Sequence, residues 1–166
     1  NWFAYQLGYG IDDLIFQNSS FIIEYNWADQ RIYKHKYKIN DFYSHGEPLG
    51  FWAGPHSEEL LASYALTVDY SEIIINYSIV KRGLISDETT ATNYNDTYNS
   101  RYSDGHELKN YFSIRLKTAS KVQGLNYIFG INKIRFENYG LINDFTYENK
   151  YSLELGIFYN YESIRD

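Results

Sequence analysis

The side chains that could do chemistry gather in one stretch, residues 29–59, which is rich in aromatic rings, histidines and carboxylates. Such a mixture suits carbohydrate, because a sugar stacks an apolar face on a ring and forms hydrogen bonds through its hydroxyls. A connection of this length is usually functional or disordered, and its prolines, glycines and tryptophan favour an ordered one. The candidate glycan-binding residues are Tyr43, His45, Trp52, His56 and Glu58.

Patterns for catalysis or metal binding are weak. Glu58 and Glu59 are adjacent, so in an extended chain they point to opposite faces and do not form a glycosidase pair. The four histidines lack metal-ligand spacing, and the absence of cysteine excludes thiolate sites. Spacing alone assigns no Ser-His-Asp arrangement, which leaves a hydrolase unsupported. The net charge of −6 argues against nucleic acid. We therefore expect no enzyme, no metal and no cofactor.

The elements that position the loop residues are predicted to be strands, because apolar and polar residues alternate. In the clearest segment Tyr151, Leu155 and Tyr159 share one face, and Ser152 and Glu154 share the other. Aromatic ends around an aliphatic middle are typical of a lipid-facing strand between aromatic girdles. The seven alternating segments are 3–9, 21–28, 63–70, 73–79, 112–117, 125–132 and 151–162.

The connections between these segments alternate in length. Short ones lie around residues 12–13, 70–72 and 117–123, and longer ones are 29–59, 82–107 and 137–150. Outer-membrane barrels have short periplasmic turns and long extracellular loops. No run of 18 apolar residues exists, so we expect no transmembrane helix, whereas a barrel strand needs only about 9–11 residues.

These observations predict an all-β fold, a transmembrane antiparallel β-barrel in a bacterial outer membrane, with residues 1–166 as a single barrel region. Closed single-chain bacterial barrels have an even number of strands. Seven strands are therefore expected to be the C-terminal strands of a larger barrel, completed by missing N-terminal strands. The alternative is a soluble sandwich or lipocalin-like barrel, which would bury the aromatic face and leave the charged face in water.

The opposite face of the strands carries charges of both signs. Such a face would line the lumen of a barrel, where the charges either pair with one another or select ions. The predicted lumen-facing residues are Glu24, Asp69, Arg115, Lys117 and Glu154.

A family resemblance covers mainly residues 31–66. The run His45-Gly46, Pro48-Leu49-Gly50, Gly54 and Ser57-Glu58, followed at once by an alternating strand, resembles the capsule assembly Wzi family of outer-membrane proteins. His56 stands where the family pattern has an acidic residue. The resemblance implies a large β-barrel that holds capsular polysaccharide at the cell surface as a lectin.

Three functions fit the predicted barrel. The first is a protein that binds or anchors surface polysaccharide through its loops, with outer-membrane lipid and polysaccharide as partners. The second is a porin-like channel for small solutes, and the third is a structural subunit of a larger outer-membrane assembly. In the second case the stretch 29–59 only folds inward and narrows the lumen.

Overall fold

A computed structural model gives the fold of the chain. It describes residues 3–29, 32, 43–44, 47–48, 51–84, 102, 105–120, 122, 124–141 and 147–159. Among these residues no helix has both the length and the apolar character needed to cross a bilayer. Nine strands and a short 3-10 turn are described, and they are β1 (Ala4–Asp12), β2 (Ser19–Ala28), β3 (Tyr43–Ser44), β4 (Glu47–Pro48), β5 (Ser57–Val68), β6 (Ser71–Gly83), β7 (His106–Ala119), β8 (Leu125–Glu137), η2 (Tyr139–Leu141) and β9 (Tyr147–Tyr159).

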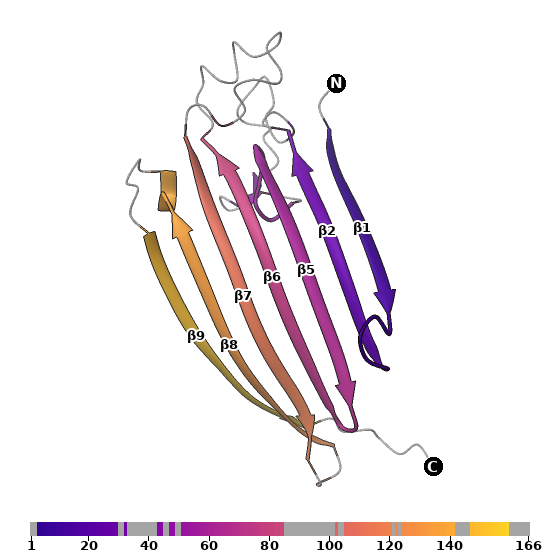
Figure 1. The fold of residues 1–166 in the computed structure, drawn as a ribbon. Helices are drawn as coiled ribbons and strands as arrows, with labels where there is room; N and C mark the ends of the chain where they lie inside the picture. Colours follow the sequence, from indigo (N-terminus) through magenta and orange to yellow (C-terminus); the bar gives the residue numbers. More distant parts are fainter. Residues whose placement is uncertain are drawn as a thin grey trace.

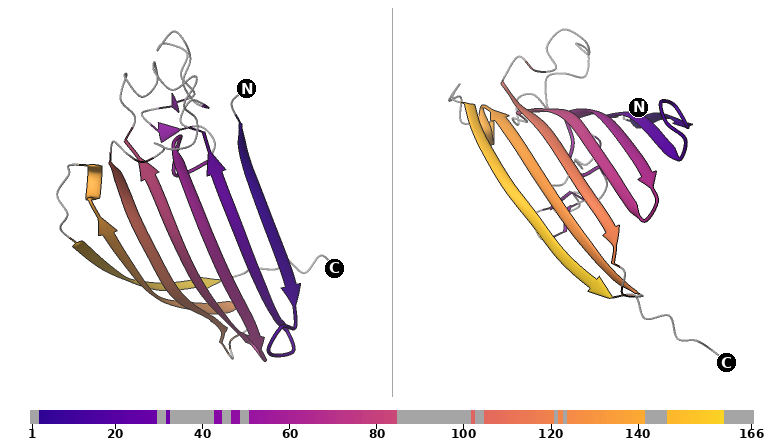
Figure 2. Two further views of the ribbon diagram at one scale, coloured as in Figure 1. Left: turned by 45° about the horizontal axis from the view of Figure 1, so that its top comes forward. Right: turned by 60° about the horizontal axis from the view of Figure 1, so that its bottom comes forward.

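Seven of the strands form one antiparallel sheet in the order β1-β2-β5-β6-β7-β8-β9, and β3 pairs with β4 separately. Each strand of the large sheet therefore lies beside its neighbour in the chain, apart from the β3-β4 insertion (Figure 1). Two further views show a single curved layer with β1 and β9 at opposite edges (Figure 2). The sheet is open among the described residues. The prediction of an all-β chain with seven antiparallel strands is confirmed.

The connections at the two ends of the sheet differ in length. Residues 13–18, 69–70 and 120–124 join strands at one end, which we call the turn end and which lies at the bottom of Figure 1. The other connections, at the loop end, span 29–56, 84–105 and 138–146. Asp69 lies in the two-residue turn with φ 50°, a left-handed conformation that Asp tolerates better than most residues. It therefore lies outside the strand on which its predicted lumen-facing position depended.

Several strands are longer than the alternation predicted. β5 begins at Ser57 and β7 at His106, in each case six residues before the predicted starts at 63 and 112. The added residues break the apolar-polar pattern, as the sequence Ser-Glu-Glu-Leu-Leu at the start of β5 shows. These residues are strand because their backbone pairs with β6, with Ser57 opposite Arg82 and His106 opposite Gly83. Neighbouring strands thus override the local pattern.

One face of the sheet, which we call the apolar face, is almost entirely hydrophobic. Because directly paired residues share a face, the register joins Tyr64, Ile75, Ile114, Ile131 and Leu153 into one row across five strands. The face comprises the odd residues 5–11, 21–27, 73–79, 127–131 and 151–157 and the even residues 60–66 and 112–116.

This apolar face is open to the surroundings. Leu153, Leu155 and Ile157 are 76%, 78% and 73% exposed, and Leu7 is 65% exposed. The only buried hydrophobic residues in the described part of the chain are Ala28, Ala53, Val80 and Phe136. Monomeric water-soluble proteins rarely leave large contiguous apolar patches uncovered. The described residues therefore place their hydrophobic side chains outside rather than in a core.

The opposite face, called the polar face, carries a network of hydrogen bonds. Asn76 donates to Ser113 (3.2 Å), Tyr111 donates to Asn132 (3.0 Å), and Asn132 donates to Ser152 (3.1 Å). These contacts connect β6, β7, β8 and β9 through side chains as well as through the backbone. These hydrogen-bonded side chains all lie on the face opposite to the exposed Leu153, Leu155 and Ile157.

An ion pair on the polar face joins β7 to β9 across the intervening strand β8. Nε and Nη2 of Arg115 in β7 donate to Glu154 Oε2 in β9 at 3.0 and 2.8 Å. Gly130 of β8 lies between them, paired with both residues. A Cβ at Gly130 would lie 3.0 Å from the Glu154 carboxylate, so the glycine leaves the space that the ion pair occupies. Arg115, Lys117 and Glu154 therefore lie on the face where the alternation put them, together with Glu24.

Candidate functional site

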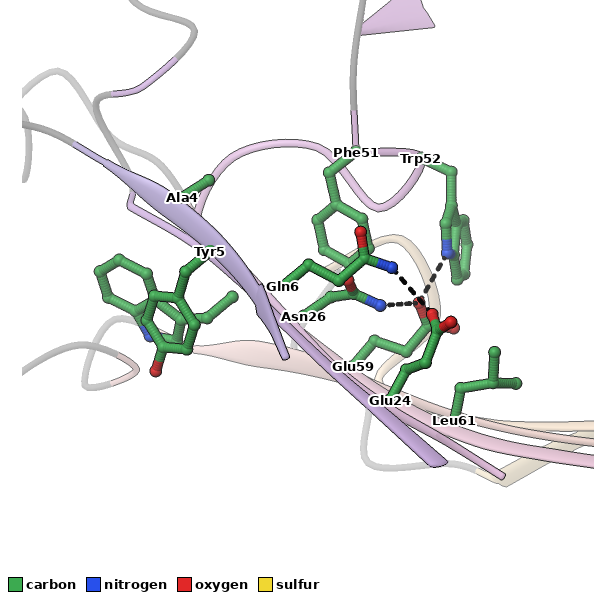
Figure 3. A pocket seen from close by; sticks show the side chains of 10 residues that line it. Ala4, Tyr5, Gln6, Glu24, Asn26, Phe51, Trp52, Glu59 and Leu61 are labelled. Atoms are coloured by element: carbon green, nitrogen blue, oxygen red, sulfur yellow. Dashed lines mark hydrogen bonds between the residues drawn. The ribbon is translucent and has the colours of Figure 1, made fainter. Parts of the chain in front are cut away.

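A cavity of about 660 Å³ lies on the polar face at the loop end of β1, β2 and β5. Figure 3 shows the strands supplying its floor, while Phe51 and Trp52 from the segment before β5 hang over it. The polar floor residues are Gln6, Glu24, Asn26 and Glu59. The cavity thus combines the rings of Phe51 and Trp52 with two carboxylates and two amides.

Glu59 is the central polar residue of this cavity. Its exposed fraction is only 6%, and its Oε2 accepts hydrogen bonds from Trp52 Nε1 (3.0 Å) and Asn26 Nδ2 (3.4 Å). Beside it, Gln6 Nε2 donates to Glu24 Oε2 at 2.8 Å. A carboxylate has about four acceptor positions, so Glu59 and Glu24 retain acceptor capacity for hydroxyl donors. The floor is therefore rigid and rich in acceptors.

Trp52 is the aromatic residue best placed to contact a ligand. Its indole is fixed by the hydrogen bond to Glu59 and lies edge-on to Phe51, with ring centroids 6.2 Å apart. Lys109 Nζ lies 4.6 Å from the centroid of the ring. Trp52 nevertheless remains 52% exposed. The ring is thus held at a defined angle, while half of its surface stays available for stacking.

His56 supports the segment that carries Trp52. It is 1% exposed and takes a left-handed conformation, with φ 57°. Its Nδ1 lies 3.0 Å from the carbonyl oxygen of Leu84, and its ring stacks on Tyr102 at 5.2 Å between centroids and 4° between planes. The backbone N–H of Gly83 donates to the carbonyl of His56 at 2.8 Å. His56 therefore anchors the segment before β5 to the end of β6, and it does not line the cavity.

Of the other predicted glycan-binding residues, Glu58 is the one whose side chain the structure describes. Glu58 points to the apolar-face side, where its Oε2 accepts a 2.7 Å hydrogen bond from Tyr25 OH. Tyr43 belongs to β3, although its side chain is not among those described, and His45 lies outside the described residues. Of the five predicted residues, the structure thus places Trp52 in the cavity and His56 in its support. Glu58 lies on the opposite face because alternation directs Glu59 inward instead.

Sequence reasoning did not assign Gln6, Asn26, Phe51 and Glu59 to the site. The alternation placed Gln6 and Asn26 on the polar side of their segments, but it gave no register that would bring them to Trp52. Glu59 could have been found if the alternation had been continued upstream, because residues 59, 61 and 63 share one face of an extended strand. Phe51 carries no such signal, because it lies in an irregular segment.

Metal chemistry has no support in the described ranges, where no group of three or more His, Asp or Glu side chains is arranged to hold an ion. The fold and the site together define an amphipathic antiparallel meander with an aromatic and acidic cavity on its polar face. No protein-family model, no curated protein and no solved structure matches the chain.

Proposed function

We propose that the sheet forms part of the wall of a transmembrane β-barrel in a bacterial outer membrane. In this arrangement the apolar face meets lipid and the polar face lines the lumen. The exposure of Leu153, Leu155 and Ile157 supports this orientation, since water would penalise such a surface. Further support comes from the aromatic residues at both ends of the face, such as Tyr151 and Tyr159 in β9.

Within this barrel we propose that the cavity binds surface polysaccharide at the extracellular mouth of the lumen. The observation that carries this proposal is the half-exposed, hydrogen-bonded indole of Trp52 above the carboxylates of Glu24 and Glu59. A sugar ring can stack on the indole while its hydroxyls donate to the carboxylates and accept from the amides. The resemblance of residues 31–66 to the capsule assembly Wzi family supports the same ligand class.

The charge of the cavity selects among polysaccharides. Glu24 and Glu59 lie in the floor, and Lys109 lies over the ring of Trp52. A carboxylated sugar placed on this floor would meet two like charges at close range. The proposed ligand is therefore a neutral, hydroxyl-rich stretch of the polysaccharide.

A porin-like channel is the second candidate function. The mixed charges of Arg115, Lys117 and Glu154 on the polar face favour it, because such a face suits a water-filled lumen. Against an open pore stands the segment from Phe51 to Trp52, which lies over the polar face at the loop end (Figure 3). A purely structural role in a larger assembly would need neither the cavity nor the charges.

Substituting Trp52 tests the polysaccharide proposal. Trp52→Ala removes the stacking surface, and we expect polysaccharide binding to weaken by about 1–3 kcal/mol, by analogy with bases stacked on aromatic side chains. The measurement is retention of capsular polysaccharide on cells that carry the full-length protein. Trp52→Phe is the matched control, since it keeps a ring but loses the donor to Glu59, and it should retain more polysaccharide than Trp52→Ala.

A second readout on the same variants separates the candidate functions. Single-channel current across a planar bilayer should remain low in the parent protein and change little in Trp52→Phe. Unchanged polysaccharide retention by a folded Trp52→Ala variant contradicts the proposed site. If the same variant instead passes a larger steady current, the segment serves to narrow a channel.

A further inference from the structure

Two cations extend from the apolar face near the loop end of β8. Lys133 and Arg135 lie two residues apart and therefore share a face, the one that also holds Phe129 and Ile131. Both residues are exposed. Among the described residues no carboxylate lies within ion-pair distance of either one, and the acid that follows on the same face is Glu137.

Tyrosines of β9 hold these cations in place. Arg135 Cζ lies 4.2 Å from the ring centroid of Tyr147, and Lys133 Nζ lies 5.7 Å from that of Tyr151. Cation-π contact uses the flat side of the guanidinium and leaves its N–H edge donors pointing outward. A guanidinium edge matches the oxygens of a phosphate in a bidentate geometry, and a lysine adds a point charge.

An apolar groove lies directly next to the cations on the same face. Its cavity is about 370 Å³, and its apolar lining consists of Ile114, Leu116, Phe129, Ile131, Leu153 and Leu155. Lys133 follows Ile131 by two residues, which is about 7 Å along a strand. The surface thus presents a hydrophobic groove with two positive charges beside it, on the side of the loop end. Such a surface complements an anionic amphiphile, which has an apolar chain and a charged headgroup.

We propose that this surface binds a phosphate-bearing lipid of the outer leaflet, with its acyl chain in the groove and its phosphate between Lys133 and Arg135. The proposal rests on the proposed orientation of the sheet, with the loop end outside the cell. Charge complementarity commits it to an anionic lipid, because the chain as a whole has 21 acidic and 15 basic residues and yet places two cations here. Juxtamembrane cations contribute about a fivefold affinity gain each toward anionic lipid.

The aromatic cluster at the other edge of the apolar face provides an internal comparison. Phe3, Tyr5 and Trp27 pack there with ring centroids 5.3–6.2 Å apart. Tyr5 lies in β1 and Trp27 in β2, Phe3 directly precedes β1, and the apolar-face residues of the two strands include no lysine or arginine. This region of the face should accept acyl chains without preference for phosphate.

The test uses the full-length protein in detergent micelles, with native mass spectrometry as the readout. Bis-phosphorylated lipid A and the same lipid with both phosphates removed are the probes. We expect the phosphorylated form to bind at least tenfold more tightly. The double variant Lys133→Gln/Arg135→Gln should lose about 30-fold in affinity for the phosphorylated form and nothing for the dephosphorylated form. Lys117→Gln on the polar face is the control and should leave both affinities unchanged.

Equal binding of the two lipids by the parent protein would overturn the proposal without any variant. The proposal would also be overturned if the double variant kept its lipid affinity but lost a self-associated form of the protein. The surface would then contact a second copy of the chain. Polysaccharide retention is measured on the same double variant and should be unchanged. A failure of the lipid site therefore leaves retention intact, whereas a failure of the polysaccharide proposal shows only in the Trp52 variants.

Discussion

On the proposed orientation, replacing Leu155 by arginine should lower the stability of the bilayer-inserted protein by about 2–4 kcal/mol, the cost of a cation at a midplane position facing lipid. Leu155 lies in the middle of the apolar run of β9, is 78% exposed, and pairs with Phe129 on the same face. Its side chain touches little of the protein, so almost all of the penalty comes from the surroundings. The measurement is a urea-dependent folding titration into lipid vesicles.

Ser152→Arg is the matched control for this substitution. Ser152 is an exposed residue of the same strand, but it lies on the polar face, where it accepts a hydrogen bond from Asn132. On the proposed orientation an arginine there enters an aqueous lumen and should cost only that hydrogen bond, about 1 kcal/mol. Equal losses for the two variants, or a Leu155→Arg protein that becomes more soluble without membrane, would contradict the proposed orientation.

Gly83→Ala should destabilise the protein by about 1–3 kcal/mol, the usual cost of overpacking. A Cβ at Gly83 would lie 2.4, 2.5 and 2.7 Å from three atoms of the His56 ring. That ring cannot move freely, because it stacks on Tyr102 and its Nδ1 lies at the Leu84 carbonyl. Displacing His56 also releases the segment that carries Trp52, so polysaccharide retention should fall together with stability.

Gly10→Ala provides the comparison for Gly83→Ala. At Gly10 the nearest atoms to an added Cβ are 3.8 Å away, in ordinary contact with Ile22 and the Phe21 carbonyl. We expect no loss of stability, since alanine also restricts the unfolded chain. Thermal unfolding followed by circular dichroism checks both variants. A Gly83→Ala protein as stable as the parent would show that His56 does not anchor the segment.

Much of the sheet could be predicted from alternation alone. In the segment 151–159 every odd residue is apolar or aromatic, and Phe158 is the one bulky apolar residue among the even positions. The ends of the strands could not be predicted, since residues such as Glu58 and Lys109 are held by pairing with neighbouring strands. Asp69 shows the same limit at a turn, because β5 ends at Val68, two residues before the predicted end at 70, and Asp69 has a positive φ.

The site was harder to predict than the sheet. Trp52 was found because a tryptophan in a long polar connection has few structural reasons to be there. Glu59 was missed in favour of its neighbour Glu58 because the strand was expected to begin only at residue 63. Neither glutamate was therefore assigned to a face of the sheet. Gln6 and Asn26 reach the cavity through the register between β1, β2 and β5, which no single-sequence pattern encodes.

The orientation of β9 in a bilayer tests the central claim most directly. The chain contains no cysteine, so single cysteines introduced into it can carry a nitroxide label without background from these residues. Labels at Leu153, Leu155 and Ile157 should be relaxed by molecular oxygen, which partitions into lipid. Labels at Ser152 and Phe158 should instead be relaxed by a water-soluble nickel chelate. Loss of this alternation, or relaxation of the odd-numbered positions mainly by the chelate, would contradict a lipid-facing apolar surface.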